Sequence, residues 1–175
     1  MASGAGDILA AAIPGLLLYA AAADLLHRRI PNSVCAAVAL VALSWQLLQG
    51  PFRIWNPVLA GLLIFLPLTW FWSRGWLGGG DVKLATALAL WAGLSDLPDF
   101  LLVTTLGGGA IAFGVLVVPW LAQRLVVVLA SLSALGLRPA APLLTGLVAP
   151  ARGVPYGLAL ATGGLWLWVE RFMAN

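Results

Sequence analysis

Cysteine and histidine are nearly absent from this sequence. Its 175 residues contain one cysteine, Cys35, and one histidine, His27. A single cysteine excludes an internal disulfide and any site built from several cysteines, and a single histidine leaves no cluster of the kind that holds zinc. The residues therefore predict a protein without a structural metal and without a bound cofactor.

Charged residues are also scarce. They make up 9% of the sequence, whereas 62% of the residues are hydrophobic and the mean hydropathy is +1.03. Such a composition excludes a soluble domain of this size and is typical of integral membrane proteins. Because one helical span takes about 20 apolar residues, the chain has room for about six spans with short loops. We expect an all-α, polytopic membrane helix bundle that forms a single domain over residues 1–175.

The few basic residues are scattered rather than clustered. The net charge of +3 and the pI near 9.8 would suit a nucleic-acid partner in a soluble protein, but here Lys and Arg lie in loops between apolar segments. In such loops they act as topology signals and contact anionic lipid. We therefore expect the lipid bilayer, and no nucleic acid, as a partner.

Apolar segments separated by short polar links give the expected spans. They cover about residues 8–26, 34–48, 57–72, 82–94, 100–118 and 155–172. Asn32 or Ser33 is placed to cap the second span. Residues 121–150 are ambiguous. We expect the stretch 125–137 to be an additional helix that lies at the interface or packs against the bundle, and the alternative is an extension of the fifth span past a kink at Pro119. Asp7 and the lack of a basic stretch before residue 8 indicate a retained first span rather than a cleaved signal peptide.

An acidic residue, Asp24, lies in the last turns of the first span. The helix dipole disfavours a carboxylate there, and an aspartate deep in a span costs roughly 2.5 to 3.5 kcal/mol on insertion scales. Unpaired carboxylates inside membranes therefore tend to be functional. The alternative is an Asp24 that lies at the membrane interface and pairs with Arg28, one helical turn further on.

Three consecutive glycines precede a second aspartate, in the run Gly78-Gly79-Gly80-Asp81. Glycine allows crowded backbone conformations and lets a substrate backbone lie close to the protein backbone. Asp81 falls in the first turn of the fourth span, where the helix dipole favours a negative charge. Two interpretations stay open for Asp81, an active-site carboxylate or a helix cap.

The charge of the loops predicts an orientation. Most Lys and Arg residues follow spans one, three and five, which places these loops in the cytoplasm and both termini outside. Asp24 and Asp81 then lie at the same depth near the cytoplasmic surface, where they can meet. Two carboxylates within about 3 Å share a proton. One can activate a water while the other polarises a carbonyl, so the pair predicts peptide-bond hydrolysis.

Three motifs, taken in order, resemble those of the type IV prepilin peptidases, a branch of the GxGD intramembrane aspartic proteases. They are Asp24 followed by Ile30-Pro31-Asn32, then Gly78-Gly79-Gly80-Asp81-Val82-Lys83, and finally Pro155-Tyr156-Gly157. The resemblance implies that Asp24 and Asp81 are the catalytic pair. It further implies that substrate is bound, or the site shaped, by Gly78, Gly80, Lys83, Pro155, Tyr156 and Gly157.

The resemblance also implies a reaction. Enzymes of this kind cut a short, basic leader from prepilins after a glycine, on the cytoplasmic side of the inner membrane. Larger members add a region with paired cysteines that binds zinc and is associated with N-methylation. This chain has neither those cysteines nor that length, so we expect no methyltransferase activity. It is more similar to the compact enzymes that serve Flp or tight-adherence pili, or to archaeal preflagellin peptidases.

Two other functions compete with proteolysis. In a small transporter or channel subunit, Asp24 and Asp81 would form a proton or cation site. That function predicts a polar path across the membrane, whereas the remaining acidic residues all lie near the opposite surface. In a pilus-assembly scaffold without catalysis, replacing either aspartate would leave precursor processing intact.

Overall fold

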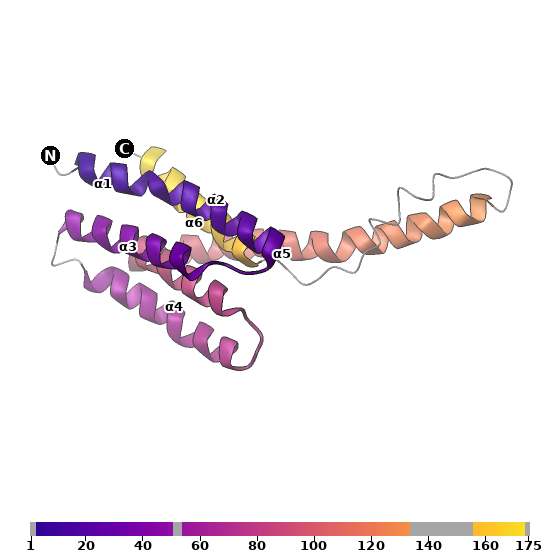
Figure 1. Ribbon diagram of the computed structural model, residues 1–175, viewed down its shortest axis with the longest axis horizontal. Helices are drawn as coiled ribbons and strands as arrows, with labels where there is room; N and C mark the ends of the chain where they lie inside the picture. The colour runs from indigo at the N-terminus through magenta and orange to yellow at the C-terminus, as the bar shows by residue number, and fades with distance from the viewer. Residues whose placement is uncertain (1–2, 51–53, 134–155, 174–175) are drawn as a thin grey trace. The chain divides into compact units, whose positions relative to one another are not determined.

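The computed structural model describes residues 3–50, 54–133 and 156–173, and within these ranges its regular structure is helical (Figure 1). The helices are α1 (Ser3–Ala10), α2 (Ala12–His27), α3 (Asn32–Gln49), α4 (Trp55–Ser73), α5 (Gly79–Ser133) and α6 (Tyr156–Met173). The prediction of an all-α helix bundle is confirmed.

Four segments of the described residues are long and apolar enough to cross a membrane. They are Ile8–His27, Asn32–Gln49, Trp55–Ser73 and Gly79–Val128. The last contains 50 residues, which as a helix measures about 75 Å, whereas the apolar core of a bilayer is about 30 Å thick. It includes both the fourth and the fifth expected spans, while α6, the expected final span, is not among the four.

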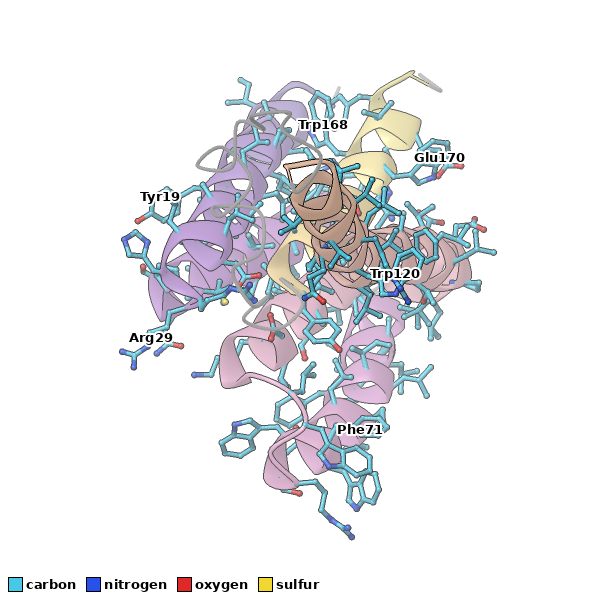
Figure 2. The ribbon with its side chains drawn as sticks, turned by 90° about the vertical axis from the view of Figure 1, so that its right-hand side faces the viewer. Tyr19, Arg29, Phe71, Trp120, Trp168 and Glu170 are labelled. Carbon is cyan, nitrogen blue, oxygen red and sulfur yellow. The ribbon has the colours of Figure 1, made fainter. Side chains whose placement is uncertain are left out.

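Many large apolar side chains face outward, and many small ones are buried between the helices. Leu18, Tyr19 and Leu66 are about 60% exposed, and Tyr19 points outward in Figure 2. Ala20 and Ala60, in contrast, are completely buried. Membrane helices pack closely through small residues, and lipid solvates the large apolar side chains that face it. The pattern is that of an integral membrane protein.

The described residues belong to two compact units. One contains residues 3–108 together with 156–173, and the other contains residues 109–133. The first unit has a core around Trp91 and Phe100, in which α6 lies along α2. Both aspartates of interest belong to this unit.

Helix α5 is broken at Gly93, where φ is 69° and ψ is 177°. These torsions are open essentially to glycine alone. The break separates a 14-residue helical segment, Gly79 to Ala92, from the remainder of α5. That segment carries Asp81 in its first turn.

The ambiguous stretch after residue 118 continues α5 as far as the structure describes it. Within α5 the non-helical torsions are those of Gly93, so the helix passes through Pro119 and ends at Ser133. Residues 125–133 thus continue α5 and do not form a separate helix, whereas their depth in a membrane stays untested. The expected end at residue 137 and the rest of 121–150 lie outside the described residues.

The predicted cap of the second span is wrong. Helix α3 follows Pro31, whose backbone is extended, and no side chain caps it. The side-chain oxygen Oδ1 of Asn32 instead accepts a hydrogen bond from Lys83 Nζ at 2.8 Å. The capping rule failed because Asn32 lies inside the helix, where its side chain is free to reach α5.

Candidate active site

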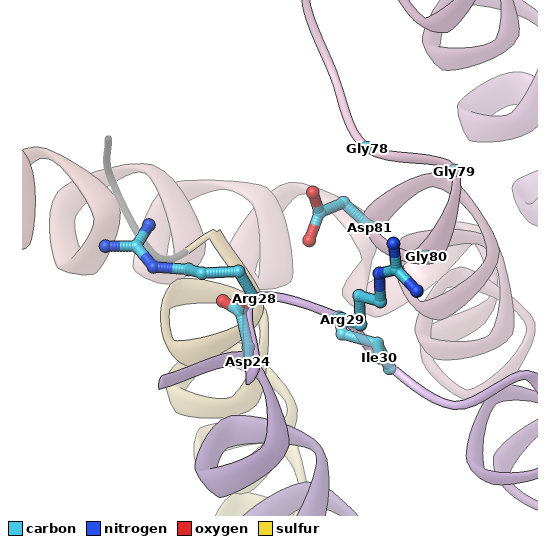
Figure 3. Close-up of a pocket in the computed structure, with 8 residues that line it drawn as sticks. All are labelled: Asp24, Arg28, Arg29, Ile30, Gly78, Gly79, Gly80 and Asp81. Carbon is cyan, nitrogen blue, oxygen red and sulfur yellow. The ribbon is translucent and has the colours of Figure 1, made fainter. Parts of the chain in front are cut away.

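The connection between α2 and α3 meets the connection between α4 and α5 around one cavity of about 230 Å³. Its lining residues are Asp24, Arg28, Arg29, Ile30, Gly78, Gly79, Gly80 and Asp81. Figure 3 shows the carboxylates of Asp24 and Asp81 directed into the space between them. The structure therefore brings together the two aspartates that the sequence places at one depth.

Asp24 lies in the last turn of α2 and is only 7% exposed. Its Oδ2 accepts a buried hydrogen bond of 2.8 Å from the backbone N–H of Gly157, the second residue of α6. Free amides at a helix N-terminus and the helix dipole both favour a negative charge. Asp24 is thus buried, and its carboxylate is held by the first turn of α6.

Gly157 has to be glycine for Asp24 to sit this close. A Cβ at position 157 would lie 2.9 Å from both Cβ and Oδ2 of Asp24 and 2.9 Å from Cδ1 of Ile30. Atoms in proteins do not approach a Cβ so closely without displacement. The first turn of α6 therefore acts through its backbone, as a donor to the carboxylate.

Asp81 is the third residue of α5, so it lies inside the first turn rather than at the cap position. Its Oδ2 lies against Gly78, where an added Cβ would come within 2.8 Å. The N–H of Val82 donates to the carbonyl of Gly78 at 3.2 Å, which closes the turn around the carboxylate. The glycine run therefore places Asp81 half-exposed at the cavity, next to the bare backbone of Gly78.

Ile30 spaces the two aspartate-bearing segments. Its side chain is 8% exposed and lies between Gly157 and Gly80, where an added Cβ would be 3.1 Å from Ile30 Cβ. From α3, the Cys35 thiol donates a long hydrogen bond of 3.8 Å to the carbonyl of Gly80. Ile30, the first residue of the Ile30-Pro31-Asn32 motif, therefore has a packing role that the sequence did not reveal.

Two arginines add positive charge at the cavity. Arg28 and Arg29 are both exposed and line it. Arg28 has left-handed torsions, φ 54° and ψ 32°, and its N–H donates to the carbonyl of Asp24 at 2.9 Å, which ends α2. A left-handed conformation costs a non-glycine residue about 1 to 2 kcal/mol. From the sequence, both arginines were expected to act as topology signals, with Arg28 also the alternative ion-pair partner of Asp24, and their place at the cavity comes from the structure.

The other predicted site residues lie apart from this cavity or outside the described chain. Lys83 is exposed and lines a second, mostly apolar cavity of about 270 Å³ between α3, α4 and α5. Tyr156 begins α6 and is 48% exposed. Pro155 lies outside the described residues.

Among the described residues, no three His, Cys, Asp or Glu side chains form a group that could hold a metal ion. The titratable groups around the cavity are two carboxylates and two guanidinium groups. Such a set can exchange a proton between carboxylates and orient a polar substrate group.

Comparison with protein families gives one match. The model of the type IV leader peptidase family matches residues 4–113, which include both aspartates and the glycine run. No curated protein and no solved structure matches the chain significantly.

Proposed function

Because the chain belongs to the type IV leader peptidase family, we propose that it is an aspartic endopeptidase with Asp24 and Asp81 as its catalytic residues. The observation that carries this proposal is the single cavity lined by both carboxylates. The substrate is a type IV prepilin of the Flp kind, cut after a glycine at the end of a short, basic leader.

The two carboxylates share one proton during the reaction. The ionised carboxylate takes a proton from a water, whose oxygen attacks the carbonyl carbon of the scissile peptide bond. The protonated carboxyl group donates its proton to the carbonyl oxygen, which gives a neutral tetrahedral intermediate. When this intermediate collapses, the carbon–nitrogen bond breaks and a proton passes to the leaving amine. The carboxylates then hold one proton again.

Backbone groups hold both carboxylates for this chemistry. The Gly157 amide fixes Oδ2 of Asp24, and Gly78 leaves room for Oδ2 of Asp81. Orientation of reacting groups supplies a large share of enzymatic rate enhancement. The absence of side chains along Gly78, Gly79 and Gly80 also lets an extended substrate backbone approach the cavity.

The proposed setting is the inner membrane, crossed several times, with the cavity near the cytoplasmic face. The basic residues Arg28, Arg29 and Arg74 lie on the connections beside the site, which supports a cytoplasmic position by the positive-inside rule. Both termini then face outward. Methyltransferase activity is not expected, because the chain has one cysteine.

Coexpression with a prepilin from the same organism tests this function. We expect Asp24→Asn and Asp81→Asn each to lower cleavage at least about a hundredfold, since the amide keeps the shape but cannot carry the proton. Asp99→Asn is the matched control, because Asp99 is exposed and distant in sequence from the cavity residues. Precursor and product are followed by their size on gels, at equal membrane levels of each variant. Cleavage at the wild-type rate by either cavity variant would return that aspartate to a capping or ion-pair role.

A further inference from the structure

The non-helical torsions of Gly93 interrupt α5. Just before this break, the carbonyl oxygens of Trp91 and Ala92 accept hydrogen bonds from outside α5, as the last carbonyls of a helix commonly do. Unsatisfied buried carbonyls are costly, most of all inside a membrane. Their partners therefore identify what holds the end of the segment that carries Asp81.

A single guanidinium group from α6 satisfies both carbonyls. Arg171 Nη1 donates to Trp91 O and Nη2 donates to Ala92 O, each at 2.7 Å. The same group binds Oδ2 of Asp96, at 3.1 Å from Nε and 2.6 Å from Nη2. It also stacks on the rings of Trp45 and Trp91, at 4.8 and 5.0 Å from their centroids. The Arg171 side chain is 17% exposed, so the interaction is largely sheltered from solvent.

Two further side chains bind the same break from other helices. Gln46 of α3 donates to Leu90 O at 3.4 Å and to Trp91 O at 3.3 Å. Asn56, near the start of α4, accepts a hydrogen bond of 2.6 Å from the N–H of Leu94. The end of the Asp81-bearing segment is therefore fixed by α3, α4 and α6 together.

Helix α6 contacts both aspartate-bearing elements, at its two ends. Near its start, Gly157 binds the Asp24 carboxylate, and near its end, Arg171 binds the carbonyls that terminate the Asp81 segment. Fourteen helical steps separate Gly157 from Arg171, about 21 Å, and eleven separate Asp81 from Ala92, about 16 Å. An α-helix keeps its residues at a fixed axial spacing, so we expect a shift at the Arg171 contact to move Asp81 as well.

We propose that Arg171 is a positioning residue for catalysis: through the carbonyls of Trp91 and Ala92 it fixes the axial position of Asp81 relative to Asp24. The inference rests on the proposed function of the two aspartates. A planar guanidinium reaches two carbonyls and a carboxylate at once, which the single ammonium group of lysine does not. Loss of this contact lets the Asp81 segment shift along its axis, although none of the residues that line the cavity has been substituted.

Steady-state kinetics of prepilin cleavage in proteoliposomes test the proposal. We expect Arg171→Gln to lower kcat about tenfold to a hundredfold, because small misplacements of catalytic groups cost that much, with KM changed less than about threefold. Arg171→Lys should restore only part of kcat. Glu170→Gln is the control, because Glu170 is next to Arg171 in the sequence and its side chain is exposed (Figure 2). A kcat that matches the control, or a loss confined to KM, would overturn the proposal.

Cross-linking gives a second readout that does not depend on the chemistry. Asp24→Cys and Asp81→Cys are combined with Cys35→Ala, and the cysteines are joined by a short bis-maleimide in membranes. We expect Arg171→Gln to lower the cross-linked fraction several-fold, and Asp96→Asn, which keeps the guanidinium, to lower it less. An unchanged fraction in the Arg171 variant would refute the positioning role, even if the aspartates prove not to be catalytic. If Arg171→Gln does not accumulate in membranes, Arg171→Lys takes its place in both assays and is judged by the same outcomes.

Discussion

At residue 157 the molecule uses a backbone hydrogen where a side chain would usually act. The Gly157 amide donates to Asp24, and the missing Cβ leaves the space that Asp24 and Ile30 occupy. The resemblance named Gly157 within a motif, but its partner lies 133 residues earlier in the chain. Local pattern cannot show such a contact, so the function of this glycine had to come from the structure.

Gly157→Ala is expected to disturb both stability and activity. The new Cβ meets Asp24 and Ile30 at 2.9 Å, and overpacking of this kind costs about 1 to 3 kcal/mol. We expect a lower thermal unfolding temperature in detergent and a fall in cleavage of at least about tenfold, because the amide donor moves away from Asp24. Gly15→Ala in α2 is the control, since no atom lies within 4 Å of a Cβ there. Equal unfolding temperatures and rates for both variants would contradict the close packing at Gly157.

Gly78→Ala is expected to separate activity from stability. The added Cβ would meet only the carboxylate of Asp81, at 2.8 Å, and the end of a side chain moves more easily than backbone. The unfolding temperature should stay close to that of the wild type, whereas kcat should fall about tenfold or more because Asp81 leaves its position. A variant that loses stability and activity in parallel would show that Gly78 acts through the fold rather than through Asp81.

Among the elements, α5 departs most from its expected form. The expected fourth span ended at Leu94 and was followed by an acidic link, and the structure has a helix break at Gly93 instead. Isolated glycine in an apolar run is a weak signal, and the side chains that satisfy the break come from three other helices. The sequence placed Arg171 at the end of the final span and Asp96 in the link after the fourth, and gave no sign that the two form an ion pair of 2.6 Å.

Gly93→Ala is expected to be strongly destabilising. Its φ of 69° is unfavourable for alanine, and a Cβ would lie 2.7 Å from Asn56 Oδ1. Strain of this kind costs about 1 to 3 kcal/mol, so we expect a clear drop in the unfolding temperature in detergent. Gly114→Ala, also in α5, has no neighbour within 4 Å of the added Cβ and should leave that temperature unchanged. If Gly93→Ala unfolds at the same temperature as Gly114→Ala, the break is not required for the fold.

On the scale of the whole molecule, the sequence predicted what depends on periodicity and depth. The apolar segments gave α2, α3 and α4 to within a few residues, because membrane spans are set by length and hydropathy. The sequence also predicted that Asp24 and Asp81 can meet, because the helix ends that carry them lie on the same side of the membrane in the expected topology. Long-range polar contacts, such as those of Gly157 and Arg171, depend on how the helices pack, and no local sequence pattern predicts them.

The proposed orientation makes a prediction about access from each side of the membrane. Ser33 and Ser95 are both exposed, at the start of α3 and after the break in α5. In a Cys35→Ala background, we expect Ser33→Cys to react with a membrane-impermeant maleimide only after the cytoplasmic face is opened. Ser95→Cys should react in intact cells whose outer membrane has been permeabilised. The reverse pattern of labelling would place the cavity on the outer face.

The most direct test of the two-aspartate mechanism uses purified protein and purified prepilin in proteoliposomes, with mass spectrometry of the products. The mechanism predicts that the wild type releases the leader and leaves one new N-terminus directly after a glycine. With Asp24→Asn or Asp81→Asn, of equal amount and equal unfolding temperature, the precursor should remain intact. Cleavage at that bond by either variant at close to the wild-type rate would contradict the mechanism.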